Sequence, residues 1–228
     1  DGCQPKDSRC VCLVSKPILK FKVYGHFKFE GYVLSCCFGS IDGNLTALAC
    51  LGNNLLVQAK VPSAAAVNRR EAFTDVEAPI TYRKIDKGSQ LVACVPSTGD
   101  IFISGEDKIL KKYDPPTDNW SAIEFNKPPH APAQEFPSHS IGTTCWDISK
   151  EFKQIATGGK DGVIMLRSIN NIGNANEIRA HTLFTGGVTA MAFSNNRSTL
   201  YTAGGDGCFM AWTIGGKPNP NQPINLDP

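Results

Sequence analysis

A recurring turn constrains this chain more than any other feature of its sequence. The clearest copy is Gly-Gly-Asp-Gly at residues 204–207, between two short runs of β-prone residues. Another copy, Gly-Gly-Lys-Asp-Gly, occupies residues 158–162, and in both of these copies a threonine lies four positions before the aspartate. An Asp-Gly step between β-prone runs is typical of a β-hairpin. The chain therefore repeats a hairpin unit, and its fold is predicted to be all-β.

Four copies of this unit can be aligned along the chain. Their turns are centred on Asn53, Asp107, Asp161 and Asp206, at spacings of 54, 54 and 45 residues. A β-propeller blade has four strands in about 40–45 residues, and longer loops account for the surplus. The copies therefore predict four-stranded antiparallel blades, arranged as a β-propeller or as part of one.

The residues around these turns resemble the WD repeat. A blade of that family has a leading histidine ahead of its first strand, a serine or threonine in the second strand, an aspartate in the next turn and a tryptophan in the third strand. The last copy has all four, and the third has Arg167 in place of tryptophan. The second copy has no clear leading histidine, and the first has His26 but neither tryptophan nor turn aspartate. The matching residues are Ser104, Asp107 and Tyr113 in the second copy, His139, Thr157 and Asp161 in the third, and His181, Thr202, Asp206 and Trp212 in the last.

These side chains predict a structural network in each blade. A turn aspartate can accept hydrogen bonds from unpaired backbone N–H groups and from the leading histidine, which can be linked in turn to the hydroxyl and the indole N–H. Where tryptophan is missing, we expect a shorter network and a softer blade. Loss of the Asp206 carboxylate is expected to destabilise the last blade, because its donors become unsatisfied. No Gly-x-Ser-x-Gly or His-Glu-x-x-His motif occurs, and the chain is predicted not to be an enzyme.

The repeat also divides the chain into segments. Residues 1–25 contain two β-like runs and are predicted to be the end of a preceding blade. The four blades are predicted at residues 26–80, 81–137, 138–180 and 181–214. The first is degenerate and carries a looped or helical insert at 63–73, the proline-rich stretch 127–137 is expected to be an extended connection, and 215–228 is expected to be a linker. Since the family usually closes on about seven blades, the chain is expected to be a segment of a larger protein.

Composition argues against several classes of function. The net charge of +2, from 23 basic and 21 acidic residues, is too balanced for a dedicated nucleic-acid or membrane-surface binder. No apolar run approaches the ~20 residues of a membrane helix. The nine cysteines show no C-x-x-C pair and no zinc spacing, so we expect reduced thiols, no metal and no cofactor.

The sequence therefore favours a non-enzymatic scaffold for protein–protein interaction. The degenerate blades, the long inserts and the closing sequence at residues 206–212 resemble WD-repeat proteins of cilia and flagella. That resemblance implies axonemal partners near microtubules or dynein, and a cytoplasmic or cytoskeletal location. The alternatives are a cytosolic adaptor of a ubiquitin-ligase or trafficking complex and, less favoured, a propeller enzyme. Trp120 is expected either to anchor the last strand of its blade or to contact a partner.

Overall fold

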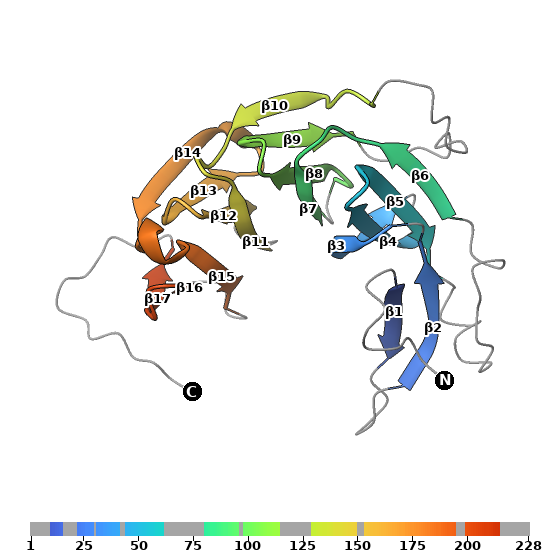
Figure 1. Cartoon of the computed structure of the whole chain (residues 1–228), viewed down its shortest axis with the longest axis horizontal. Helices are drawn as coiled ribbons and strands as arrows, with labels where there is room; N and C mark the ends of the chain where they lie inside the picture. The colour runs from blue at the N-terminus through green and yellow to red at the C-terminus, as the bar shows by residue number, and fades with distance from the viewer. Residues whose placement is uncertain are drawn as a thin grey trace. The chain divides into compact units, whose positions relative to one another are not determined.

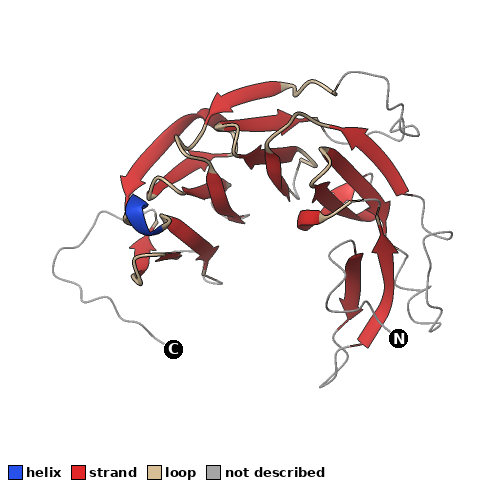
Figure 2. Cartoon of the chain, viewed as in Figure 1, coloured by secondary structure: helices blue, strands red, loops and turns tan. Residues whose placement is uncertain are grey.

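The structure is a computed structural model of the 228-residue chain. It describes residues 10–15, 22–29, 31–41, 44–61, 80–95, 98–114, 129–149, 153–194 and 199–214. Almost all of these residues lie in antiparallel strands or in the turns between them (Figure 2). The all-β class and the four-stranded antiparallel blades predicted from the sequence are confirmed. The chain forms two compact units, Asp1–Glu135 and Phe136–Pro228.

The first unit contains three sheets (Figure 1). A two-stranded sheet is formed by β1 (Cys10–Ser15) and β2 (Lys22–Lys28). A four-stranded sheet follows, with β3 (Val33–Ile41), β4 (Asn44–Leu51), β5 (Leu55–Lys60) and β6 (Ile80–Lys84) in chain order. The next sheet has β7 (Ser89–Cys94), β8 (Ile101–Gly105), β9 (Ile109–Tyr113) and β10 (Gln134–Pro137), and β10 runs across the boundary between the units.

The second unit contains two sheets. The first has β11 (Thr143–Ser149), β12 (Gln154–Gly159), β13 (Val163–Ser168) and β14 (Asn171–Arg179). The short 3-10 helix η1 (Leu183–Thr185) leads to β15 (Val188–Phe193), which pairs with β16 (Thr199–Gly204) and then with β17 (Phe209–Thr213) in a three-stranded sheet. Each of the four larger sheets thus contains one copy of the sequence repeat.

The four larger sheets share an irregularity in their first strands. The register of each first strand against the second shifts by one residue, at Val33/Ser35, Ser89/Leu91, Thr143/Cys145 and Val188/Ala190. A bulge of this kind re-aims the side chains that follow it. The common position of the shift makes the residues after it equivalent from sheet to sheet.

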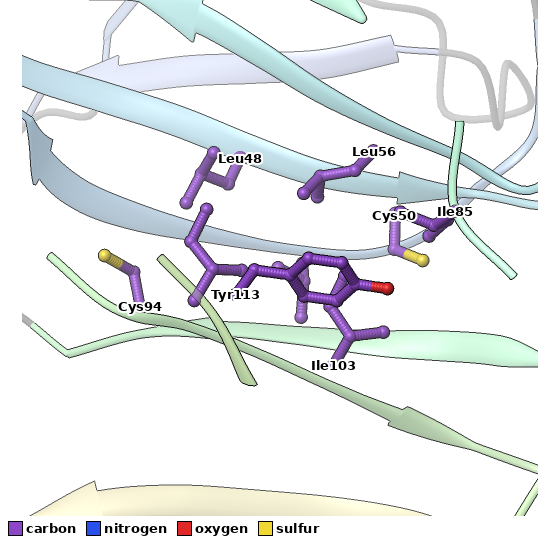
Figure 3. Close-up of a cluster of buried hydrophobic side chains, with 9 residues drawn as sticks. Leu48, Cys50, Leu56, Ile85, Cys94, Ile103 and Tyr113 are labelled. Atoms are coloured by element: carbon purple, nitrogen blue, oxygen red, sulfur yellow. The ribbon is translucent and has the colours of Figure 1, made fainter. Parts of the chain in front are cut away.

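The core of the first unit forms because β4 is apolar on both faces. Leu48 and Cys50 point to one face and pack with residues of the next sheet, including Ile103 and Tyr113 (Figure 3). Alternate residues such as Ala49 point to the opposite face, where they form a second cluster. Successive side chains of a strand point to opposite faces, so a continuous apolar run fits a strand that is covered on both sides.

Several observed boundaries differ from the predicted ones. The first four-stranded sheet ends at Lys84 rather than at residue 80, because β6 pairs with β5. β2 extends to Lys28, so His26 lies within a strand opposite Cys12 and not in the connection between β2 and β3. The end of the proline-rich stretch forms strand β10 at a sheet edge, where a proline is tolerated. The predicted insert at 63–73 and the linker at 215–228 lie outside the described residues.

Candidate functional site

The last blade brings its four predicted side chains into one hydrogen-bonded chain. Nδ1 of His181 lies 3.1 Å from Oδ1 of Asp206, and its Nε2 lies 3.1 Å from Oγ1 of Thr202. The indole Nε1 of Trp212 donates to the same hydroxyl oxygen at 3.0 Å. A neutral histidine protonated on Nδ1 satisfies every member, since Thr202 can then donate to Nε2 while it accepts from the indole.

Asp206 connects this hydrogen-bond network to the surface loops. Its carboxylate accepts the backbone N–H of Cys208 at 3.0 Å and that of Thr182 at 3.0 Å. These N–H donors, with a smaller contribution from His181, lower the pKa of Asp206 to about 2. The aspartate therefore fixes the β16–β17 turn and the loop ahead of β15 at the same time.

The third blade repeats the arrangement as far as the threonine. Nδ1 of His139 lies 3.1 Å from Oδ1 of Asp161, and its Nε2 lies 2.9 Å from Oγ1 of Thr157. Asp161 also accepts the N–H groups of Ser140 at 2.8 Å and Val163 at 3.1 Å. Burial lowers the pKa of His139 although Asp161 opposes that shift. Burial alone would raise the pKa of Asp161, but His139 and the backbone donors together lower it.

Arg167 does not take the place of the missing tryptophan in this hydrogen-bond network. Its guanidinium donates to the carbonyl of Ile172 at 2.8 Å and to that of Pro137 at 2.5 Å. The side chain is buried, and burial lowers its pKa. The histidine network therefore ends at Thr157, one link shorter than in the last blade, while the arginine ties β13 to its neighbouring backbone.

The second blade has an ion cluster in place of a histidine. The ammonium of the buried Lys111 pairs with the turn residue Asp107 and lies 3.4 Å from Oδ2 of Asp86. The hydroxyl of Ser104 donates to the carbonyl of Ile109 at 3.2 Å, and Tyr113 is fully buried in the core. Sequence reasoning missed Lys111 and Asp86, for which the one signal is a lysine four positions after the turn aspartate.

A loop ahead of β15 holds the most exposed aromatic side chain of the described residues. Phe184 is 89% exposed and Leu183 is 46% exposed, and both belong to η1. The loop is anchored at its start by the Thr182–Asp206 bond and closed by the N–H of Gly187, which donates to the Thr182 carbonyl at 3.2 Å. Phe184 is therefore presented on a fixed turn. Sequence reasoning missed Phe184.

The chemistry of these residues is that of structural supports. The rings of His139 and His181 are fully buried, and each histidine is bonded on both nitrogens. Among the described residues, no group of three or more His, Cys, Asp or Glu side chains is placed to hold a metal ion. No helix in the described part of the chain has the length and apolar character needed to cross a membrane. Trp120 lies outside the described residues.

Comparisons with known proteins agree with this geometry. The family described as "WD domain, G-beta repeat" matches residues 174–213, which include all four side chains of the last blade. The fold is similar to that of a chain in a crystal structure of the Mitotic Checkpoint Complex, with a TM-score of 0.55 and 14% sequence identity over 85% of this chain and 53% of that chain. Residues 174–213 thus match a WD repeat, and the larger sheets have the antiparallel form of β-propeller blades.

One curated relative is a ciliary protein. Over 196 residues the chain is 24% identical to Cilia- and flagella-associated protein 43 of Chlamydomonas reinhardtii. The match covers 81% of this chain but 11% of that relative, so it concerns one part of a much longer protein.

Proposed function

We propose that this chain is a non-enzymatic scaffold that binds other proteins, and that it works in a ciliary or flagellar complex of the axoneme. The single observation that carries the scaffold role is the anchored loop at residues 182–187. Loops held on a rigid sheet framework are a common way for a protein to present contact residues. A rigid, exposed aromatic side chain provides a large contact area at a small entropic cost.

The anchoring of this loop supports the proposal more than exposure alone. Asp206 holds Thr182 at one end, and the N–H of Gly205 donates to the carbonyl of Gly187 at 3.0 Å at the other end. Phe184 projects from the turn between these two fixed points. A partner that covers this ring therefore need not order the loop first, which lowers the free-energy cost of binding.

The ciliary assignment is supported by the match to Cilia- and flagella-associated protein 43. It is also consistent with the degenerate second blade, where Lys111 and not a histidine pairs with the turn residue Asp107. Fold similarity does not by itself define a function, so this part of the proposal depends on the relative.

The scaffold role is tested by affinity capture with the Phe184→Ala variant from an extract of ciliated cells. We expect the parent to retain specific proteins and Phe184→Ala to lose some of them. Phe209→Ala is the matched control, because Phe209 is also exposed, at 66%, in the same unit but on β17. Identical captured proteins for parent and Phe184→Ala would contradict the role of this loop.

The location is tested by imaging the tagged protein in the same cells and by identifying its captured partners. Axonemal localisation with tubulin- or dynein-associated partners would support the proposal. Capture of ubiquitin-ligase or vesicle-coat subunits, without axonemal proteins and with a diffuse cytosolic signal, would overturn the ciliary part and leave the scaffold role standing.

A further inference from the structure

The loop ahead of β11 exposes an apolar side chain at the same point of the repeat as the loop that carries Phe184. Ile141 is 46% exposed and directly follows Ser140, whose backbone N–H donates to Oδ2 of the turn residue Asp161 at 2.8 Å. Leu183 stands in the same position, directly after the residue that binds the turn carboxylate of the last blade, and is also 46% exposed. Each loop therefore presents an apolar side chain next to a backbone anchor.

The β12–β13 turn joins these two loops. The backbone N–H of Lys160 in this turn donates to the carbonyl of Gly142 in the first loop at 3.0 Å. Gly187 in the second loop approaches so closely that a Cβ atom there would lie 2.6 Å from the carbonyl carbon of Lys160, and a Cβ atom at Gly162 would lie 3.4 Å from the backbone nitrogen of Leu183. The exposed apolar side chains thus lie around a single turn, and we name them the two-loop patch: Ile141, Leu183 and Phe184.

The exposed charge at this turn is a cation. Lys160 is exposed at the tip of the turn, between the two loops. The turn carboxylates cannot contact a partner in the same way, because the side chains of Asp161 and Asp206 are only 9% and 14% exposed. Both also accept backbone N–H groups and are paired with a histidine. A partner at this surface therefore meets apolar carbon and an ammonium group.

The same positions carry different side chains in the second blade. The hydrogen bond of Lys160 recurs there, since the N–H of Glu106 donates to the carbonyl of Gly88 at 3.0 Å. The position of Ile141 is taken by Lys87, and both Lys87 and Glu106 are exposed. The backbone geometry is thus a property of the repeat, whereas the combination of apolar side chains with a cation is particular to the second unit.

We propose that the two-loop patch binds a short segment of a partner protein that combines adjacent apolar residues with an aspartate or glutamate. The apolar residues of that segment cover Phe184, Leu183 and Ile141, and burial of this apolar surface is the main source of affinity. The carboxylate pairs with Lys160 at the edge of the contact, where a charge pair contributes to selectivity. The inference rests on the proposed scaffold role, because both use Phe184, and it adds the chemistry of the partner segment.

Selection of peptides on the immobilised 228-residue chain tests this chemistry. The probe is a random dodecapeptide phage library, and the most enriched peptide is then synthesised and titrated by calorimetry. We expect the enriched peptides to combine adjacent apolar residues with aspartate or glutamate. Phe184→Ala should weaken binding of the synthetic peptide at least about tenfold, as for a hot-spot residue. Ile141→Ser should also weaken it, although Ile141 lies outside the loop that carries Phe184.

The charge of Lys160 gives a readout that apolar contact alone would not change. Lys160→Glu should weaken binding of the acidic peptide at least about fivefold, and high salt should reduce this difference. A new selection on Lys160→Glu should enrich lysine and arginine in place of acidic residues. Lys153→Glu is the matched control, because both lysines are exposed and flank β12 at its opposite ends. This control should leave the affinity and the selected charge unchanged.

Several outcomes would overturn the inference. Selected peptides without an acidic preference, or equal effects of the two lysine variants, would mean that Lys160 does not select the partner segment. The scaffold role would then stand, because the capture experiment with Phe184→Ala tests it separately. Failure to enrich any peptide would also overturn the inference. In that case, binding of phosphatidylserine vesicles that Phe184→Ala abolishes would identify a membrane surface as the occupant, and dimerisation that Phe184→Ala abolishes would identify a second copy.

Discussion

The indole Nε1 of Trp212 lies 3.0 Å from the hydroxyl oxygen of Thr202, which itself lies 3.1 Å from Nε2 of His181. This contact links β17 to β16 in addition to the hydrogen bonds of the ladder. It also completes a chain of four side chains that begins at Asp206. The third blade lacks the tryptophan, so the two blades form a natural comparison.

The variant Trp212→Phe tests the contribution of the indole donor. Phenylalanine retains most of the packing of Trp212 in its apolar cluster but removes the N–H. We expect the free energy of unfolding to fall by about 1 kcal/mol, the usual contribution of one hydrogen bond, measured by urea denaturation. Thr202→Val in the same background should then cost less than it does alone, and additive effects of the two changes would contradict the contact.

Arg167 is expected to stabilise its blade although it departs from the repeat. Arg167→Met removes the donors to the carbonyls of Ile172 and Pro137, and we expect a loss of about 1–3 kcal/mol in unfolding experiments. Arg167→Trp restores the residue of the last blade and supplies a donor for Thr157, but it leaves both carbonyls unsatisfied. This variant should also be less stable than the parent, and a melting temperature at or above that of the parent would contradict the assigned role.

The ion cluster of the second blade offers a pair of neighbouring lysines for comparison. The side chain of Lys111 is 4% exposed and lies between Asp107 and Asp86. Lys111→Met leaves two carboxylates without their shared cation, and we expect a loss of about 3 kcal/mol. Lys112 pairs with Asp100 at 3.1 Å, but its side chain is 26% exposed. Lys112→Met should therefore cost no more than about 1 kcal/mol. Equal losses for the two variants would contradict the stronger contribution assigned to the buried pair.

The turn chemistry explains how much of this structure could be predicted. The Asp-Gly steps at Asp161 and Asp206 encode the hairpins locally, so the sheets and the side chains around them were accessible from sequence spacing. Lys111 was signalled only by its spacing from Asp107, because its other partner Asp86 lies in another strand connection and no local signal joins those two residues. The boundary at Lys84 was missed because the pairing of β6 with β5 is set by long-range packing and not by turn residues.

Acid is expected to destabilise the last blade through Asp206. Its pKa is about 2 in the folded chain, below the ordinary value of 3.8, because the N–H groups of Cys208 and Thr182 bind the ionised form. As the pH falls below about 4, the unfolded chain takes up the proton first, so the folded state loses stability. Melting temperatures measured against pH should fall in this range. Asp206→Asn should be less stable at neutral pH and converge with the parent in acid, and a gap independent of pH would contradict this linkage.

The two glycines that follow the turn aspartates form a matched test of backbone crowding. Gly162 and Gly207 have almost the same left-handed φ values, 77° and 78°. A Cβ atom at Gly162 would lie 1.9 Å from the carbonyl oxygen of His181, whereas a Cβ atom at Gly207 would meet nothing within 4 Å. Gly207→Ala should therefore cost only the left-handed strain, about 1–2 kcal/mol.

Gly162→Ala carries the same strain, and it also forces the β12–β13 turn away from the strand connection that holds His181. We expect at least about 2 kcal/mol of additional loss in urea denaturation, as for other overpacked sites. The carbonyl of Gly162 accepts the N–H groups of Ala180 and His181 at 3.0 Å each, so displacement of the turn should also loosen the leading histidine of the next blade. Equal losses for the two alanine variants would show that the backbone contact at Gly162 contributes nothing to the fit between these blades.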